Sequence, residues 1–364
     1  MGEVRAGVFF GNGKFDLQTF ARPSPPPGGM VLQVEAVGLC GSDLAQLEGA
    51  AHVPGETSPV VPGHEIVGRI LEKADDCVDP LTVGTRVAVD QVLRCGRCSA
   101  CQAQRPHCED MRVYGYSFGL DEGAGLWGGY GEYMALQPGT HLAPLPEEIP
   151  AAELTLFEPL SSAINWFTKA GLVAGETIVI QGPGHMGLAL TALARTMGAG
   201  KIVVTGMSND QSRLDAALAL GADAVVDVED RDVREELAAM THGAMADLVV
   251  DMAPGSTATI PLAVELARPG GRILLAGLKH FAEVEGLVSD LIVLKDLSIL
   301  GGAGMTPASH RRAAELLTTG RLPTALLRGE VYDLDRLDLA LDMLARKVPG
   351  KDAVRVSLVH QHEN

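Results

Sequence analysis

Aromatic residues, basic residues and long apolar runs are all scarce in this chain of 364 residues. Phe, Trp and Tyr make up 4% of it, so its core has to consist mainly of aliphatic side chains. Lys and Arg number 29 against 46 acidic residues, and the formal net charge of −17 disfavours nucleic acid or an anionic membrane as a partner. The absence of a run of eighteen apolar residues argues against a transmembrane helix.

A secretory signal is also missing from the N-terminus, MGEVRAGVFFGNGKFD, which has neither a long apolar segment nor a cleavage site. We therefore expect a cytoplasmic protein. In that reducing compartment, clustered cysteines are more often metal ligands than disulfides. The apolar content of 46% and the length are sufficient for two domains with cores.

The sequence pattern changes near residue 151. Before it, short Val-rich runs such as 30–38 and 65–71 are bounded by Gly or Pro, as strands are. The run 151–172 has helical spacing, and Pro159 is expected to kink or interrupt it. Apolar strand candidates then alternate with helices, at 177–182, 201–206, 224–228, 247–252, 272–277 and 297–302. This alternation predicts an α/β fold with a doubly wound parallel sheet.

The tail from residue 303 returns to helical spacing and ends in a strand candidate, 353-AVRVSLV-359. It has no nucleotide-binding pattern, so we expect it to fold back onto the first domain. The prediction is a first domain of residues 1–159 and 303–364, interrupted by a second domain of residues 160–302.

A glycine-rich turn, 182-GPGHMG-187, follows the first strand of the second domain and opens a helix. Gly182 permits the tight turn, Gly184 allows a pyrophosphate to approach the backbone, and Gly187 allows helix and strand to pack closely. The helix start at His185 and Met186 offers N–H groups to the phosphates. The context of strand, turn and helix indicates a dinucleotide site.

The residues after the second strand of this domain bear on the choice between NAD and NADP. That strand ends in Gly206, where an acidic residue usually holds the ribose hydroxyls. Asp210 in the next loop favours NAD if it reaches the ribose, because a carboxylate there repels a 2′-phosphate. Alternatively, space at Gly206 with Ser208 and Arg213 nearby suits NADP. We lean slightly to NAD.

Four of the six cysteines lie within 95-CGRCSACQAQRPHC-108. Thiolates at this spacing bind one Zn²⁺ tetrahedrally. A shell of four thiolates leaves no open position, so this site would be structural and would stabilise an irregular lobe. The alternative is a set of free thiols or a redox switch. The predicted ligands are Cys95, Cys98, Cys101 and Cys108.

A second constellation is dispersed over 38-GLCGSD-43, 63-GHEIVG-68 and 158-EPLSSA-163. Cys40 and His64 are zinc ligand types, and a carboxylate is a common third ligand. A catalytic zinc ion keeps one position open for water or substrate. Taken singly, each of these residues also suits an ordinary buried or surface position.

Together, these motifs resemble the zinc-dependent medium-chain dehydrogenases, which include alcohol, polyol and threonine dehydrogenases. The resemblance extends over essentially the whole chain. It implies a GroES-like catalytic domain with a structural zinc lobe at about residues 90–112, and an inserted Rossmann domain. It also implies a homodimer or homotetramer.

The resemblance assigns roles to individual residues. Cys40 and His64 would bind the catalytic zinc, Ser42 would take the substrate proton, and Asp43 would orient a ligand histidine. Either Glu158 or Glu65 would be the third ligand, and Glu158 is preferred. Leu278 is expected among the cofactor contacts. Many relatives have a relay histidine where this chain has Ala45.

The expected activity is hydride transfer between a secondary alcohol or polyol and NAD(P), giving a ketone or aldehyde. One catalytic and one structural zinc ion per chain are expected. Two alternatives remain open: a zinc-independent enone or quinone reductase on the same scaffold, and a non-enzymatic protein that binds nucleotide or zinc.

Overall fold

The computed structural model describes residues 2–50, 53, 55–105 and 108–362. The chain forms two compact units, the first with residues 1–158, 306–319 and 328–364, and the second with residues 159–305 and 320–327. The sequence placed the whole tail from residue 303 with the first domain. Residues 303–305 and 320–327 belong instead to the second unit, and the second of these segments does so because the short helix η2 (Thr324–Leu327) packs against α5 (His185–Thr196).

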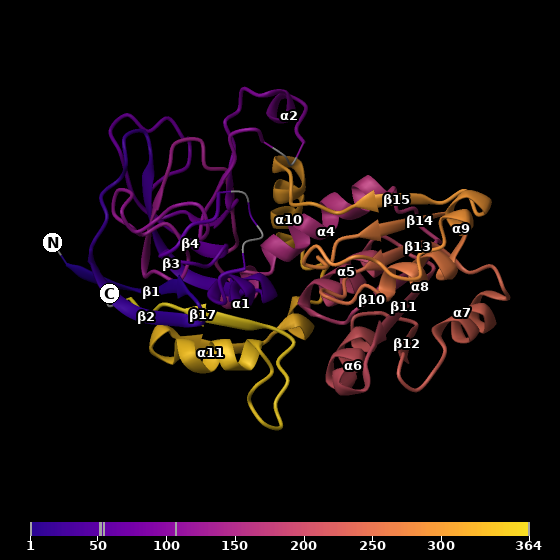
Figure 1. Ribbon diagram of the computed structural model, residues 1–364. Coiled ribbons are helices and arrows are strands. Elements are labelled where there is room, and N and C mark those ends of the chain that lie inside the picture. Colours follow the sequence, from indigo (N-terminus) through magenta and orange to yellow (C-terminus); the bar gives the residue numbers. More distant parts are fainter. Residues whose placement is uncertain (1, 51–52, 54, 106–107, 363–364) are drawn as a thin grey trace. The chain divides into compact units, whose positions relative to one another are not determined.

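The first unit contains a seven-stranded sheet in which the order is β16-β17-β3-β4-β5-β9, with β8 also pairing with β3. The strands are β3 (Met30–Leu39), β4 (Glu65–Lys73), β5 (Arg86–Val89), β8 (Tyr133–Leu136), β9 (Leu142–Pro144), β16 (Glu330–Asp333) and β17 (Val356–Val359). The C-terminal strand β17, yellow in Figure 1, pairs antiparallel with the indigo β3. The tail thus completes the sheet that begins near the N-terminus.

Smaller elements surround this sheet. Strands β1 (Glu3–Gly11) and β2 (Lys14–Ala21) form a hairpin whose turn places Asn12 and Gly13 at positive φ. The remaining elements of the unit are α1 (Gly41–Leu47), β6 (Val92–Leu93), α2 (Ser99–Gln102), β7 (Arg112–Val113), α3 (Ala151–Leu154), α10 (Pro307–Thr318), η3 (Leu334–Arg336) and α11 (Leu337–Leu344). The two-stranded β6–β7 pair flanks the cysteine-rich segment on both sides.

The second unit is a six-stranded parallel sheet with the order β12-β11-β10-β13-β14-β15 (Figure 1). The strands are β10 (Thr177–Gln181), β11 (Lys201–Gly206), β12 (Ala224–Asp227), β13 (Ala246–Asp251), β14 (Ala267–Leu275) and β15 (Ser298–Gly301). The chain runs outward from β10 to β12 and returns to β13 on the other side of β10. This confirms the predicted doubly wound fold.

Helices connect the strands of the second unit: α5, α6 (Gln211–Ala219), α7 (Val233–Thr241), α8 (Thr259–Leu266) and α9 (Ser289–Leu294). A core cluster of this unit consists of Val, Leu, Ile and Ala. The buried aromatic residues Tyr114, Tyr130, Phe9 and Phe118 belong to the core of the first unit. An aliphatic sheet core is what the scarcity of aromatic residues predicts.

Pro159 does not break a helix, contrary to the expectation from sequence. Helix α4 (Phe157–Ala170) passes through it, and the interruption lies at residues 155–156 instead. Pro159 stands in the first turn of α4, where backbone N–H groups have no intrahelical partner and the missing donor costs little. Within the described residues, no helix is both long and apolar enough to cross a membrane.

Candidate active site and metal centres

The pairing of β3 with β4 brings Cys40 and His64 together. The two strands are antiparallel, with Gly38 opposite Glu65, so the end of β3 meets the start of β4. Cys40 follows β3 as the N-cap of α1, and His64 directly precedes β4. Ligand atoms of Cys40, His64 and Glu65 all lie within 4.8 Å of one another.

This donor set fits a zinc ion. It combines a thiolate, an imidazole and a carboxylate, the three ligand types that catalytic zinc sites use. His64 is 6% exposed and Glu65 is fully buried, while Cys40 is only partly buried. The partial exposure of Cys40 suits a site that has to admit a substrate.

Asp43 and Tyr116 orient the imidazole of His64. Its Nδ1 lies 3.2 Å from Asp43 Oδ1 and 3.2 Å from the hydroxyl of Tyr116, which leaves Nε2 for a metal. Burial lowers the pKa of His64, but Tyr116 and Asp43 outweigh it and raise that pKa well above its usual value. Asp43 also accepts a hydrogen bond from the backbone N–H of Cys40 at 2.8 Å, so it fixes both ligands.

The hydroxyl of Tyr116 also contacts Ser42. Tyr116 donates to Ser42 Oγ at 3.0 Å. Burial raises the pKa of Tyr116 far above its usual value, so it remains a protonated donor. The hydroxyl hydrogen of Ser42 is then available to a bound alcohol or ketone oxygen. Sequence reasoning missed Tyr116, because a buried tyrosine in a glycine-rich segment carries no distinctive signal.

The two candidate third ligands have different surroundings. Glu65, not Glu158, belongs to the described cluster around Cys40 and His64, although the sequence favoured Glu158. Glu158 lies in the first turn of α4, where its Oε1 accepts from Gln91 Nε2 at 3.1 Å. Glu65 comes close to Cys40 through the β3–β4 register, which pairs Gly38 with Glu65 and which no sequence motif encodes.

Arg355 is a second residue that sequence reasoning missed. Its Nη2 lies 2.6 Å from Glu65 Oε2 and 2.7 Å from Thr155 Oγ1, and it is 4% exposed. A Cβ on Gly38 would lie 2.0 Å from Glu65 Oε2, so only glycine leaves room for this ion pair. The signal was a lone arginine in the apolar strand run 353-AVRVSLV-359, because a charge there needs a buried partner.

The four remaining predicted ligands form a separate cluster. Ligand atoms of Cys95, Cys98, Cys101 and Cys108 lie within 4.8 Å of one another, and all four are free thiols. The Sγ atoms of Cys95 and Cys101 are 4.0 Å apart. A tetrahedron with Zn–S bonds of about 2.3 Å has edges of roughly 3.8 Å, so the set fits one zinc ion.

Backbone N–H groups prepare these thiols for metal binding. Those of Glu109 and Cys101 lower the pKa of Cys98 to about 6, which favours the thiolate that binds metal. The N–H of Cys95 points to Cys108 Sγ at 3.3 Å, and that of Cys98 to Cys95 Sγ at 3.4 Å. The short helix α2 and the flanking β6–β7 pair hold these backbone groups in place.

The glycine-rich turn of the second unit has the geometry that a pyrophosphate requires. Gly182 has a φ of +105°, and a Cβ there would lie 2.9 Å from the carbonyl oxygen of Met252. A Cβ on Gly187 would lie 2.0 Å from the carbonyl oxygen of Gly182, whereas one on Gly184 would meet nothing within 4 Å. Gly184 is the N-cap of α5 and makes no side-chain capping bond, so the helix N-terminus is open to an anion.

These surroundings predict that one alanine substitution lowers the stability of the fold and that another weakens cofactor binding. Gly187→Ala should lower the free energy of unfolding by about 1–3 kcal/mol, because its Cβ would collide with a backbone oxygen. Gly184→Ala should leave the urea midpoint unchanged and raise the Kd for NADH about tenfold, because its methyl group occupies the space for phosphate. Urea unfolding and fluorescence titration measure the two effects. Unaltered NADH binding by Gly184→Ala would remove the turn from the cofactor site.

The other predicted cofactor residues lie near the carboxyl ends of strands of this sheet. His185 and Met186 begin α5, and Leu278 follows β14, with its carbonyl oxygen accepting from Gly255 N at 2.9 Å. Ser208 and Asp210 form the short helix η1 (Ser208–Asp210) after β11, and Arg213 lies in α6. Parallel sheets of this kind bind dinucleotides at this edge.

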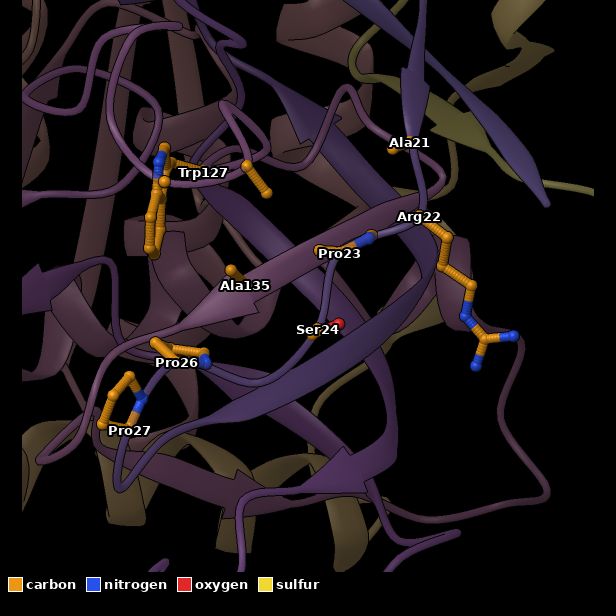
Figure 2. Close-up of a pocket in the computed structure, with 10 residues that line it drawn as sticks. Ala21, Arg22, Pro23, Ser24, Pro26, Pro27, Trp127 and Ala135 are labelled. Carbon is orange, nitrogen blue, oxygen red and sulfur yellow. The ribbon is translucent and has the colours of Figure 1, made fainter. Parts of the chain in front are cut away.

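A further pocket lies in the first unit, beside the proline-rich segment that follows β2. Its volume is about 540 Å³. Figure 2 shows Pro23, Pro26, Pro27 and Trp127 on its walls and the side chain of Arg22 extending away. None of the predicted metal ligands, catalytic residues or cofactor residues is among its described lining residues, so the pocket is separate from both metal clusters.

Comparison with known proteins agrees with this geometry. The alcohol dehydrogenase GroES-like domain matches residues 26–147, and the zinc-binding dehydrogenase domain matches residues 186–319. The chain is 34% identical to a "probable alcohol dehydrogenase" of Mycobacterium tuberculosis over 364 residues, 96% of each chain. It is 30% identical to a sorbitol dehydrogenase of Halalkalibacterium halodurans, again over 96% of each chain.

A solved structure gives the same result. A zinc-binding dehydrogenase of Sinorhizobium meliloti bound to NADP aligns with a TM-score of 0.87 and 27% identity, over 99% of this chain and 100% of that one. The chain belongs to the zinc-dependent medium-chain dehydrogenase family. Its activity class is that of an NAD(P)-dependent oxidoreductase of alcohols or polyols.

Proposed function

We propose that the protein interconverts a secondary alcohol or polyol and the corresponding ketone or aldehyde at the Cys40–His64–Glu65 cluster. The observation that carries this proposal is the convergence of the three ligand atoms within 4.8 Å. A zinc-independent reductase on the same scaffold does not require a thiol, an imidazole and a carboxylate that converge within that distance. A non-enzymatic protein that only binds zinc or nucleotide does not require the Ser42 hydroxyl next to these ligands.

Each side chain has a defined task in this proposal. Zn²⁺ bound by these ligands would supply Lewis acidity towards an alcohol oxygen, and a bound nicotinamide would accept the hydride. Ser42, to which Tyr116 donates at 3.0 Å, hydrogen-bonds the substrate oxygen and relays its proton, accepting that proton while releasing its own hydroxyl hydrogen to water. Asp43 keeps His64 in the tautomer whose Nε2 is an acceptor.

The ligand set of the catalytic metal is part of the proposal. Cys40 and His64 are two ligands, and Glu65 is the carboxylate within reach. Arg355 pairs with Glu65 and offsets its negative charge when the metal is absent. Cys95, Cys98, Cys101 and Cys108 hold a second, structural zinc ion, so two zinc ions per chain are expected. Glu158, hydrogen-bonded to Gln91, remains the alternative third ligand.

We assign the catalytic role to the first unit and cofactor binding to the second. Gly182, Gly184 and Gly187 would accommodate the pyrophosphate at the N-terminus of α5. NAD is proposed in preference to NADP, since the charge of Asp210 in the loop after β11 disfavours a 2′-phosphate. A reducing, cytoplasmic location is proposed, because thiolates that serve as metal ligands have to stay reduced.

A homodimer or homotetramer completes the proposal. β15 is the edge strand of the parallel sheet, and its Ile299 is 38% exposed. Val293 and Leu294 of the neighbouring α9 are 77% and 81% exposed. An apolar edge strand of this kind is an aggregation hazard unless a partner covers it, and a second copy of β15 would extend the sheet.

The proposed function is tested with a panel of secondary alcohols and polyols, each offered with NAD and with NADP. Reduced nicotinamide should accumulate with at least one of them, and dialysis against a chelator should abolish the reaction by removing the metal. Activity that survives complete loss of metal would favour the zinc-independent reductase. Cofactor binding without turnover of any alcohol or ketone would favour the non-enzymatic alternative.

A further inference from the structure

The end of β11 lacks the acidic residue that usually holds the adenosine ribose, and the structure leaves no room for one. A Cβ on Gly206 would lie 2.9 Å from Pro183 Cγ and 3.1 Å from Leu214 Cδ2. A larger side chain would therefore displace the turn or α6.

Asp210, the acidic residue that the sequence suggested for the ribose, faces the interior of its own loop. Its Oδ2 accepts from the backbone N–H of Met207 at 3.0 Å, and the residue is 8% exposed. The carboxylate closes the turn before η1. The negative charge of Asp210 stays close to the end of β11, but its Oδ2 is already engaged in the hydrogen bond within the loop.

Glu229 supplies an exposed carboxylate from the neighbouring strand. β12 pairs in parallel with β11, with Gly206 opposite Asp227, and Val228 N donates to Gly206 O at 2.9 Å. Two residues beyond Asp227, Glu229 Oε2 accepts from the backbone N–H of Ser208 at 2.9 Å. A carboxylate is therefore held against the loop after β11, although no acidic residue of β11 itself stands there.

The charges around Glu229 are predominantly negative. Asp227, Asp230 and Asp232 flank it in sequence. Two cations near Glu229 have other partners: Arg231 donates to Val225 O and pairs with Glu236, and Arg234 pairs with Asp232 and Glu265. A third cation, Arg213, lies in α6, after the loop that carries Ser208. A second pocket of about 540 Å³ opens beside Glu229, lined in part by Val228, Pro261 and Leu262.

We propose that Glu229 is the residue that makes this protein select NAD over NADP. One carboxylate oxygen is fixed by Ser208 N–H, and the other accepts a hydrogen bond from the adenosine 2′-hydroxyl. A 2′-phosphate would meet this carboxylate at close range and would compete with it for the same N–H. The inference rests on the proposed function, because it requires a dinucleotide at the carboxyl edge of the sheet.

The test uses two nucleotide fragments that differ only at the 2′-position, AMP and adenosine 2′,5′-bisphosphate, with the intact protein in a calorimeter. Wild type should bind AMP at least about tenfold more tightly, because two like charges repel at short range. Glu229→Gln keeps the acceptor oxygen for Ser208 N–H and removes the charge. It should bind the bisphosphate about tenfold more tightly than wild type does, and this gain should shrink at high salt.

A matched control separates Glu229 from the general acidity of this face. Glu235→Gln removes the same charge from the first turn of α7 and should leave the ratio of the two affinities at the wild-type value. An equal shift in both variants, an unchanged ratio in Glu229→Gln, or a wild type that prefers the bisphosphate would overturn the proposal. A wild type that binds neither fragment would instead refute the cofactor site of the proposed function.

A second measurement tests the same variants with the reduced cofactors. Titration with NADH and NADPH, followed by nicotinamide fluorescence, should show the selectivity of Glu229→Gln moving towards NADPH by a similar factor. The KM for NAD should rise, because the 2′-hydroxyl loses its charged acceptor, whereas kcat at saturating NAD reports on the reacting groups at the nicotinamide end. A fall in NADH and NADPH binding by equal factors would mean that Glu229 only supports the loop, and would also overturn the proposal.

Discussion

Replacing Cys40 with serine should lower kcat/KM for the alcohol about a thousandfold or more. The Lewis acidity that the metal contributes is worth several kcal/mol in the transition state, and each 1.4 kcal/mol is a factor of ten. Serine is a poor ligand for Zn²⁺ at neutral pH because its hydroxyl stays protonated. The zinc content should fall from two ions to one per chain, as measured by atomic emission, together with the loss of turnover.

The fold should survive this substitution. The N-cap of α1 uses the backbone N–H of Cys40 with Asp43, and serine keeps both. Circular dichroism and NADH binding should therefore match the wild type. Cys77→Ser is the matched control, since Cys77 is also partly buried and belongs to neither metal cluster. Full activity in Cys40→Ser would exclude a catalytic metal at this position.

The parallel sheet was predictable because its strands are buried on both faces. Apolar runs such as 177–182 and 247–252 alternate with helical patterns, and the structure places β10 and β13 within a residue of them. The thiolate cluster was also predictable, because Cys95, Cys98 and Cys101 are close in the chain and need no long-range fold to converge. In both cases the information is local.

The missed residues depend on contacts that no local pattern encodes. Tyr116 and Ser42 are 74 residues apart, and Arg355 and Glu65 are 290 apart. The proposed preference for Glu65 over Glu158 depends on the strand register at Glu65 and on the contact of Glu158 with Gln91, and no sequence motif encodes either of them. Glu229 comes to the cofactor edge only because β12 lies next to β11 in the folded sheet.

Cys98→Ser should destabilise the first unit through the structural zinc. Cys98 caps α2, its Sγ accepts from the N–H of Cys101 at 3.4 Å, and its pKa of about 6 makes it a ready thiolate. When one of the four thiolates is lost, much of the zinc-binding free energy that stabilises the folded lobe is lost with it. We expect the midpoint of thermal unfolding to fall by about 6–12 °C, which corresponds to about 3 kcal/mol in a unit of this size.

The measurements are calorimetry, zinc content and limited proteolysis on the same preparation. Zinc should fall to one ion per chain, and cleavage should appear first between residues 94 and 109, where the backbone depends on the thiolate cluster. The lost zinc in Cys98→Ser should be the structural one, so turnover at low temperature should persist while thermal inactivation accelerates. That pattern is the reverse of the one expected for Cys40→Ser, and only two separate metal sites produce both. Retention of two zinc ions and an unchanged melting temperature in Cys98→Ser would show that the four cysteines are not a structural metal site.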